Sequence, residues 1–475
     1  MNENHKKLTE GPIITSLFSL AWPIIIASFL QVAYQLTDSF WVGRLGEKAI
    51  AAVAISVPLS FFLISLGTGF AIAGATLTAQ YFGARQQKMV DHAGGQTLLA
   101  AITIAIILGS TGFILAPKML SLMGAGSEIL PAASSYLRLV FISLPINFCF
   151  FIFQSIMRSL GQPQISVKII AVTVLLNFVF DPLFIFGFGA IPRFEVVGAA
   201  YATLATQSLA AIFGLWLLFS GKRGIKLSLS NLKPDWQFLK KTFALGLPTS
   251  IEQSARSLGM VTMTSIIAGF GTLAVASYGA GSNILQIVII SSLGLSAATA
   301  ALIGQNIGAG KTERADEIAR LSLKISLSAL TIAGLLIFIF APNLVSIFAP
   351  GEQTVIDGGS LFLRIIALSF GLIGIQMTVN SVMQASGNTS ISMFLTIASQ
   401  WLVQLPLAFI LSRYTSLGKI GIWLAFPATN IIMSLIAFLV FKNGSWKNKK
   451  LTEDRRLEGE ISQNADQEDI IPYDA

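Results

Sequence analysis

Long apolar runs recur along the whole chain, and they constrain its fold more than any other feature. A helix needs roughly 20 apolar residues to cross the hydrocarbon core of a bilayer, since each residue adds about 1.5 Å. Charged residues make up 11% of the 475 residues and apolar residues 54%, whereas soluble domains carry about 25% charged residues. The sequence therefore predicts an all-α membrane protein that crosses the bilayer many times.

The apolar runs predict about twelve transmembrane helices. The predicted spans are residues 13–42, 48–81, 93–117, 131–159, 164–189, 196–220, 237–270, 274–307, 316–341, 356–386, 391–413 and 419–441. Several spans exceed 20 residues, so tilt or extension beyond the bilayer is expected.

The basic residues predict the orientation. If the N-terminus is inside, the cytoplasmic segments hold about 19 basic residues and the outer connections roughly 6. The largest basic blocks are then residues 222–241 and 311–324. The positive-inside rule thus predicts a cell-membrane protein with both termini in the cytoplasm. This distribution accounts for the net charge of +8 through topology, so nucleic acid is not an expected partner.

The second half of the chain repeats the first. Matching pairs are LAWP at 20–23 with LGLP at 245–248, AQYFGA at 79–84 with GQNIGA at 304–309, and MRSLGQPQIS at 157–166 with MQASGNTSIS at 383–392. The shift is 225 residues in the first two pairs and 226 in the third. Six spans in each half give a parallel repeat, which predicts two pseudo-symmetric six-helix bundles around a central cavity.

The repeat and the polar connection near its centre divide the chain into five predicted parts. These are a cytoplasmic N-terminus (1–12), an N-terminal six-helix bundle (13–221), a cytoplasmic linker (222–236), a C-terminal six-helix bundle (237–442) and a disordered cytoplasmic tail (443–475). The tail is predicted to be disordered because its hydrophobicity is low and its charges are mixed.

Asp38 lies inside the first apolar run and is a candidate cation site. A carboxylate within a membrane helix costs roughly 2.5–3.5 kcal/mol on insertion scales, so it requires a partner or a watery cavity. Gln31, Tyr34 and Asp38 are three and four residues apart and lie on one helix face. Pro23, upstream, predicts a bend or hinge in the same helix.

Asn177 and Asp181 form a second polar pair, one helical turn apart in the fifth span. With Thr203 of the sixth span and Asp38, they are expected at one depth in the outer half of the membrane. Carboxylate, amide and hydroxyl oxygens can hold a proton or a hard cation such as Na⁺. Two carboxylates in a poorly solvated pocket do not both ionise easily, so one can take up and release a proton.

The acids break the repeat. Asp38 aligns with Met263, and Asp181 aligns with Leu407. A packing device of the fold would recur in both halves, so this one-sidedness favours a functional role. The alternative, that Asp38 and Asp181 lie at the membrane surface and face water, stays open at this point.

Other intramembrane residues give weaker signals. Glu252 and Arg256 are four apart, which predicts an intrahelical ion pair. Gln154, Met157 and Met260 are candidates for the wall of a substrate cavity, together with Pro23, Gln31 and Tyr34 named above, because polar and flexible apolar side chains suit varied ligands.

These motifs resemble the multidrug and toxic compound extrusion (MATE) family over about 430 residues. The resemblance rests on AWP with Pro23, Asp38 before WVGRLG, AQYFGA, MRSLGQP, NFVFDP and VGAAYAT, in this order. It implies two facing six-helix bundles and export of amphipathic, mostly cationic compounds driven by H⁺ or Na⁺. The sequence looks closest to the DNA-damage-inducible and archaeal-like branches.

In those branches the coupling pocket matches Asp38, Asn177, Asp181 and Thr203, and these positions are the implied H⁺ or Na⁺ ligands. Pro23 matches the bending proline of the family. The acids that another branch places on the seventh and tenth helices have no counterpart here, which leaves a second cation site without support. No cofactor is implied apart from the coupling ion, and a monomer in contact with membrane lipid is expected.

Two other functions are compatible with a chain of this kind. A flippase for a lipid-linked precursor would need a lateral opening and a basic cavity, but few basic residues lie away from the loops. A membrane-embedded enzyme would need catalytic His, Cys or paired acids. The chain has one cysteine, Cys149, and two histidines in polar segments, His5 and His92, so an enzyme is not expected.

Overall fold

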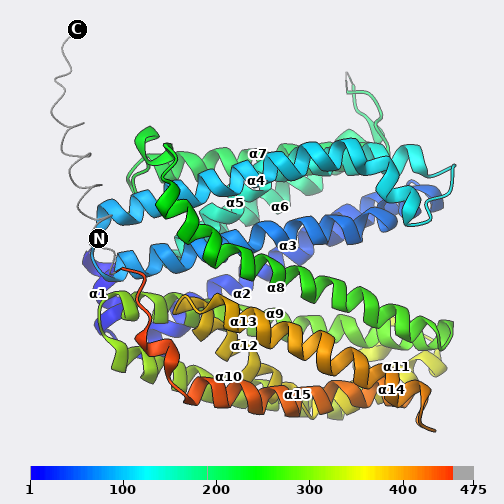
Figure 1. Cartoon of the computed structure of the whole chain (residues 1–475). Coiled ribbons are helices and arrows are strands. Elements are labelled where there is room, and N and C mark those ends of the chain that lie inside the picture. Colours follow the sequence, from blue (N-terminus) through cyan, green and yellow to red (C-terminus); the bar gives the residue numbers. More distant parts are fainter. Residues whose placement is uncertain (1, 190, 453–475) are drawn as a thin grey trace.

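The computed structural model describes residues 2–189 and 191–452, and it folds into helices (Figure 1). The elements are α1 (Asn2–Glu10), α2 (Ile13–Gly43), α3 (Glu47–Gly83), α4 (Gln87–Leu122), α5 (Leu130–Ser159), α6 (Pro163–Phe186), α7 (Val196–Phe219), η1 (Leu229–Leu232), α8 (Trp236–Ala268), α9 (Thr272–Gly308), α10 (Thr312–Phe348), α11 (Gln353–Ala367), α12 (Phe370–Ala385), α13 (Thr389–Ile397), η2 (Ala398–Gln404), α14 (Leu405–Arg413), α15 (Lys419–Lys442) and η3 (Ser445–Asn448).

The prediction of an all-α membrane protein with about twelve helices is confirmed. Within the described residues, ten helices are long and apolar enough to span a bilayer, and an eleventh span forms if the bent pair α11–α12 is counted as one. The long helix α8 is not among them, since it begins with a polar segment and carries Glu252 and Arg256.

The internal repeat is visible in matching contacts. The Nε of Arg138 donates a hydrogen bond to the carbonyl oxygen of Phe113 at 3.3 Å. The Nε of Arg364 makes the same bond to Phe338, also at 3.3 Å. In both pairs the guanidinium group lies over the ring of the phenylalanine. Both residues of the second pair follow those of the first by the shift seen in the sequence, so these arginines have the same structural role in each half.

The leading helix of each half begins in the core of the other half. Leu17 and Leu20 of α2 are buried among residues of α9, α10 and α12, whereas Phe238 and Leu245 of α8 are buried among residues of the N-terminal half. Figure 1 shows α8 passing from beside α4 to the C-terminal group of helices. The first turns of α2 and α8 thus lie across the predicted bundle boundaries at 13 and 237, because each buries its apolar face against the opposite half.

Glycines permit these crossings. A Cβ atom added to Gly69 of α3 would clash with the backbone of Ser250 in α8, and one added to Gly294 of α9 would clash with Ile25 in α2. The two contacts are repeat equivalents. Ser250 and Ile25 each follow the proline of their helix, Pro248 or Pro23, by two residues. The helix α2 continues unbroken through Pro23.

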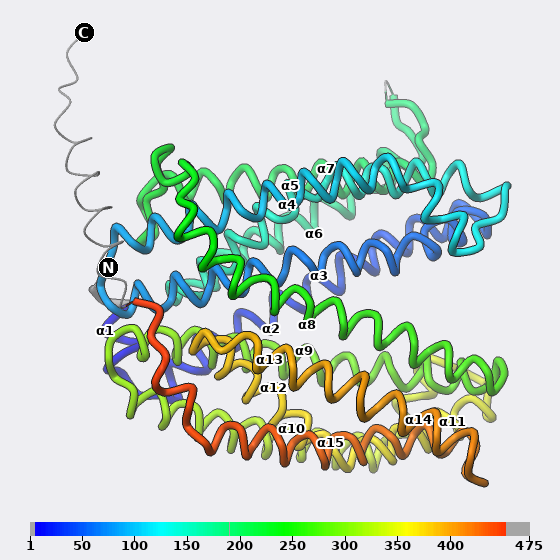
Figure 2. Tube along the Cα trace, viewed as in Figure 1, coloured from blue at the N-terminus to red at the C-terminus, as the bar shows by residue number. Residues whose placement is uncertain are grey.

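The two halves meet most closely at the end of the molecule where the N-terminus lies (Figure 2). There the side-chain amide of Gln80 donates to the carbonyl of Ala385 at 2.8 Å, and that of Gln305 donates to the carbonyl of Ser159 at 2.6 Å. These bonds are again repeat equivalents. The polar motifs around Gln80 and Gln305 therefore tie the halves together.

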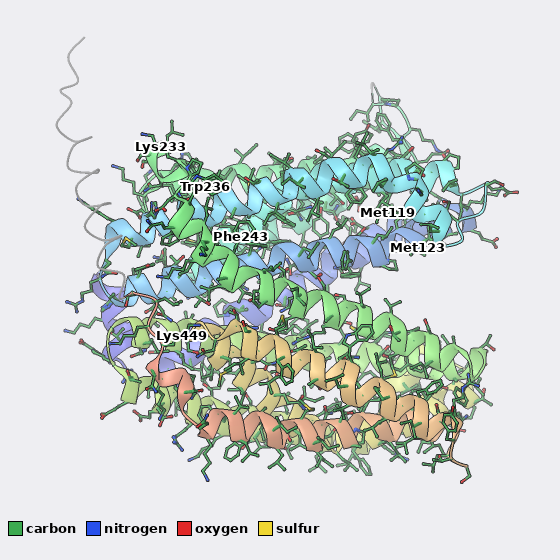
Figure 3. All side chains as sticks on the ribbon, in the orientation of Figure 1. Met119, Met123, Lys233, Trp236, Phe243 and Lys449 are labelled. Atoms are coloured by element: carbon green, nitrogen blue, oxygen red, sulfur yellow. The ribbon has the colours of Figure 1, made fainter. Side chains whose placement is uncertain are left out.

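Both terminal segments add to this contact. The ring of His5 in α1 bonds the carbonyl of Gly83 at 3.0 Å, whereas the side-chain amide of Asn306 in α9 donates to the carbonyl of Leu8 at 3.3 Å. After α15, the amide of Leu451 donates to the side chain of Gln80 at 2.9 Å. Figure 3 shows Lys449 at this junction, consistent with its 2.7 Å bond to the carbonyl of residue 387.

The segment after residue 443 is therefore ordered as far as the structure describes it, unlike the disordered tail predicted from composition. Trp446 is buried on α15, and Leu451 is buried against the N-terminal half. Two apolar side chains in a polar stretch were too weak a signal to predict this docking. The rest of the predicted tail, residues 453–475, lies outside the described residues.

The central linker docks on α4. Ile225 and Leu227 are buried in the N-terminal core, and the side-chain amide of Gln96 donates to two linker carbonyls. Asp235 caps the first turn of α8 by accepting two backbone hydrogen bonds. The linker thus sets where α8 begins.

Candidate cation site

The structure brings together the four residues predicted to hold the coupling ion. Asp38 comes from α2, Asn177 and Asp181 from α6, and Thr203 from α7. The hydroxyl of Thr203 donates to Oδ2 of Asp38 at 3.4 Å, and the amide of Asn177 donates to Oδ1 of Asp181 at 3.0 Å. The helix α2 packs against α6, and Asp38 lies near Asp181 and Asn177 there. The site therefore joins three helices.

Burial makes the site unusual. Asn177 and Asp181 have no solvent exposure, and Asp38 is only partly exposed. One oxygen of each residue is buried and lacks a hydrogen-bond partner among the described residues, namely Oδ1 of Asp38, Oδ1 of Asn177 and Oδ2 of Asp181. Buried oxygens without donors are costly. A proton or a cation would satisfy them.

The arrangement supports proton or cation binding on chemical grounds. Two neighbouring carboxylates repel each other when both are charged, so a shared proton or a bound positive ion stabilises the pair. The described residues contain no group of three or more acid, histidine or cysteine side chains that could hold a metal. Any Na⁺ would therefore need amide and hydroxyl oxygens as well, and Asn177 and Thr203 offer them.

Two tyrosines extend the site. The hydroxyl of Tyr34, one turn before Asp38, lies 2.6 Å from the hydroxyl of Thr206, and both residues are buried. Tyr136 of α5 stands near both carboxylates. Thr206 has a signal in the sequence, because it follows Thr203 by three residues on the same helix. Tyr136 has none, because only tertiary packing places α5 beside α6 and α7.

The remaining candidates for the cavity wall are dispersed. Gln31 and Met260 are exposed, and Pro23 is half-buried. Gln154 is buried, with a side-chain nitrogen that has no partner among the described residues. Met157 is fully buried in the core of the N-terminal half, so it does not line an open cavity in this conformation.

Glu252 forms a different polar cluster in the C-terminal half. Its carboxylate is fully buried and accepts hydrogen bonds from Ser392 at 2.8 Å, Thr396 at 3.2 Å and Gln384 at 3.2 Å. The predicted ion pair with Arg256 is present, but its 3.5 Å separation makes it the longest of these contacts. The main role of Glu252 is thus to join α8 to α12 and α13.

We expect Glu252→Ala to lower the thermal unfolding midpoint of the purified protein by several degrees. Each buried donor left without an acceptor costs about 1–3 kcal/mol, and several donors lose their acceptor together. Glu252→Gln, which keeps one acceptor oxygen, should lose less. Glu317→Ala is the matched control, since Glu317 is an exposed acid on α10. An unchanged midpoint for Glu252→Ala would contradict a structural role.

Two repeated helical halves that pack around a common axis are an architecture of secondary transporters. The MatE family model matches residues 23–183 and 248–410 of this chain, one match in each half of the repeat. The chain therefore belongs to the MatE family, whose members are transporters of the multidrug and toxic compound extrusion group and not enzymes.

Individual relatives agree with this assignment along nearly the full length. The chain is 28% identical to the probable multidrug resistance protein YoeA of Bacillus subtilis over 453 residues, covering 94% of this chain and 97% of YoeA. It is 27% identical to an FAD transporter of Shewanella oneidensis, with 92% and 96% covered. A solved outward-facing multidrug resistance MATE transporter matches with a TM-score of 0.87 and 26% identity, over 94% and 99% of the two chains.

Proposed function

We propose that this protein is a secondary-active multidrug exporter that moves amphipathic, mostly cationic organic compounds out of the cell in exchange for H⁺ or Na⁺. The observation that carries the proposal is the pair Asp38 and Asp181, each with one buried oxygen that has no hydrogen-bond partner among the described residues. A carboxylate pair of this kind binds one positive charge and changes its net charge when that charge leaves.

The proposed cycle couples this site to two arrangements of the halves. The contacts through Gln80 and Gln305 hold the halves together at the end that carries both terminal segments, and Figure 1 shows the two groups of helices diverging toward the opposite end. Binding of H⁺ or Na⁺ at Asp38 and Asp181 from that end would favour one arrangement, and release at the other end would favour the second.

The orientation follows from the same proposal. Both termini, and the closed end beside them, lie in the cytoplasm, as the basic residues of the loops indicate. The protein then acts as a monomer in the cell membrane, with the coupling pocket in the N-terminal half. The pocket residues also support membership of the DNA-damage-inducible or archaeal-like branch.

Dye efflux from proteoliposomes tests this function. With a pH gradient or a Na⁺ gradient imposed separately, we expect a cationic dye to move against its own gradient in response to at least one of them. Liposomes without either gradient are the control. Movement of a fluorescent lipid or of FAD, with no dye transport under either gradient, would replace this proposal with a flippase or an exporter of anionic compounds.

A further inference from the structure

A large crevice lies between α6 and α7, and none of the four residues of the candidate cation site lines it. Its volume is about 1120 Å³, which is larger than the roughly 300–1,000 Å³ of ordinary small-molecule sites. All of its lining residues fall between residues 162 and 223. None comes from the C-terminal half, so the crevice is formed by the N-terminal half alone.

The walls of the crevice are apolar and accessible. They come from the first turns of α6 and the last turns of α7, which lie at the same end of the molecule. Val172 is 55% exposed, Ile212 is 65% exposed and Trp216 is 50% exposed. Large apolar side chains so exposed on a membrane-spanning helix suit contact with acyl chains. The crevice therefore has room and chemistry for lipid tails.

The mouth of the crevice is basic. Lys168, Lys222 and Arg223 line it, and no acidic residue does. The ammonium group of Lys222 lies 5.2 Å from the ring of Trp216, and the side-chain amide of Gln162 donates to the carbonyl of Arg223 at 3.0 Å. Within the described part of the chain, no salt bridge neutralises these three cations, so they are available to an anion.

We propose that this crevice binds an anionic glycerophospholipid, with its phosphate held by Lys168, Lys222 and Arg223 and its acyl chains lying between α6 and α7. Basic pockets at the cytoplasmic ends of transmembrane helices attract anionic head groups, at about 1 kcal/mol for each basic residue. An organic cation would meet three like charges and no carboxylate, so a transported drug is a poor occupant.

One of the three cations at the mouth, Lys168, has no basic counterpart in the other half of the protein. At the repeat shift, Lys168 corresponds to Phe394, which is 64% exposed. The fold therefore does not require a cation at this position. This difference supports a ligand of the N-terminal half alone, independent of the transport function proposed above.

Quenching of Trp216 by brominated lipids tests the site. The full-length protein is reconstituted in phosphatidylcholine vesicles that contain either brominated phosphatidylglycerol or the same fraction of brominated phosphatidylcholine. The signal of Trp216 is the difference between the unaltered protein and Trp216→Phe. We expect brominated phosphatidylglycerol to associate at least about fivefold more strongly, since one basic contact alone corresponds to that ratio, and the preference to fall in high salt.

The combined variant Lys168→Gln, Lys222→Gln and Arg223→Gln should abolish this preference. Its matched control is Lys240→Gln, Lys324→Gln and Lys442→Gln, which removes three exposed cations outside the crevice and should keep the preference. Equal quenching by the two lipids in the unaltered protein would overturn the proposal without any variant. The proposal would also be overturned if the triple variant of the crevice kept its preference for brominated phosphatidylglycerol. The same holds if an added organic cation relieved the quenching of Trp216 and added anionic lipid did not.

Discussion

Asp38→Asn should reduce dye efflux by about tenfold or more, because the amide cannot bind and release the coupling charge. Asp181→Asn should have the same effect, since the proposed coupling site needs both carboxylates to bind one positive charge. The measurement is dye transport in proteoliposomes that contain equal amounts of folded protein.

The design separates coupling from folding. Asp357→Asn is the control, because Asp357 is an exposed acid on α11 and its loss should leave transport unchanged. Asp38→Asn is similar in shape to the native residue and should keep the elution profile of the unaltered protein. Full efflux by a folded Asp38→Asn variant would remove the proposed role of the pair.

Gly83→Ala and Gly308→Ala should each reduce transport by about tenfold, because they prevent close approach of the two halves at the end beside the termini. A Cβ atom at Gly83 would clash with the backbone carbonyl of Gln305, and one at Gly308 would clash with that of Gln80. Backbone atoms cannot move aside as a flexible side chain can. The two variants should behave alike, since the contacts are related by the repeat.

Distances between spin labels report the cause. Labels on the exposed residues Lys88 and Glu313, at the starts of α4 and α10, should show a longer mean separation in either glycine variant than in the unaltered protein. Gly279→Ala in α9 is the control, because nothing lies within 4 Å of the added Cβ atom. Normal transport with an unchanged label distance would show that the closed end tolerates the methyl group.

Much of the fold could be predicted because apolar length and repetition are local properties of the sequence. Predicted spans such as 131–159 and 419–441 end within one residue of α5 and α15. The crossing of α2 and α8 could not be predicted, because Leu17 and Phe238 are equally suited to burial in either half. The docked segment around Trp446 and Leu451 was missed for a related reason, since composition averages hide two anchoring side chains.

The candidate cation site could likewise be predicted only in part. Helical spacing places Asn177 and Asp181 on one face, and the broken repeat singles out Asp38. Whether these residues come together depends on packing of α2 against α6 and α7, which place Asn177, Asp181 and Thr203 more than 130 residues from Asp38 in the sequence, and the structure packs these helices together. Tyr136 and the fully buried state of Met157 likewise depend on neighbours that no local pattern identifies.

The sequence by itself determined the membrane-spanning helices, their twofold repetition and the lack of acidic counterparts to Asp38 and Asp181 in the second half, because these depend on the identity and order of residues along one chain. Tertiary structure decided which end of the molecule is closed, which oxygens remain without a donor and where a basic crevice opens between α6 and α7. Those features arise from contacts between helices distant in sequence, where a shift of one helix changes the partners of every side chain on its face.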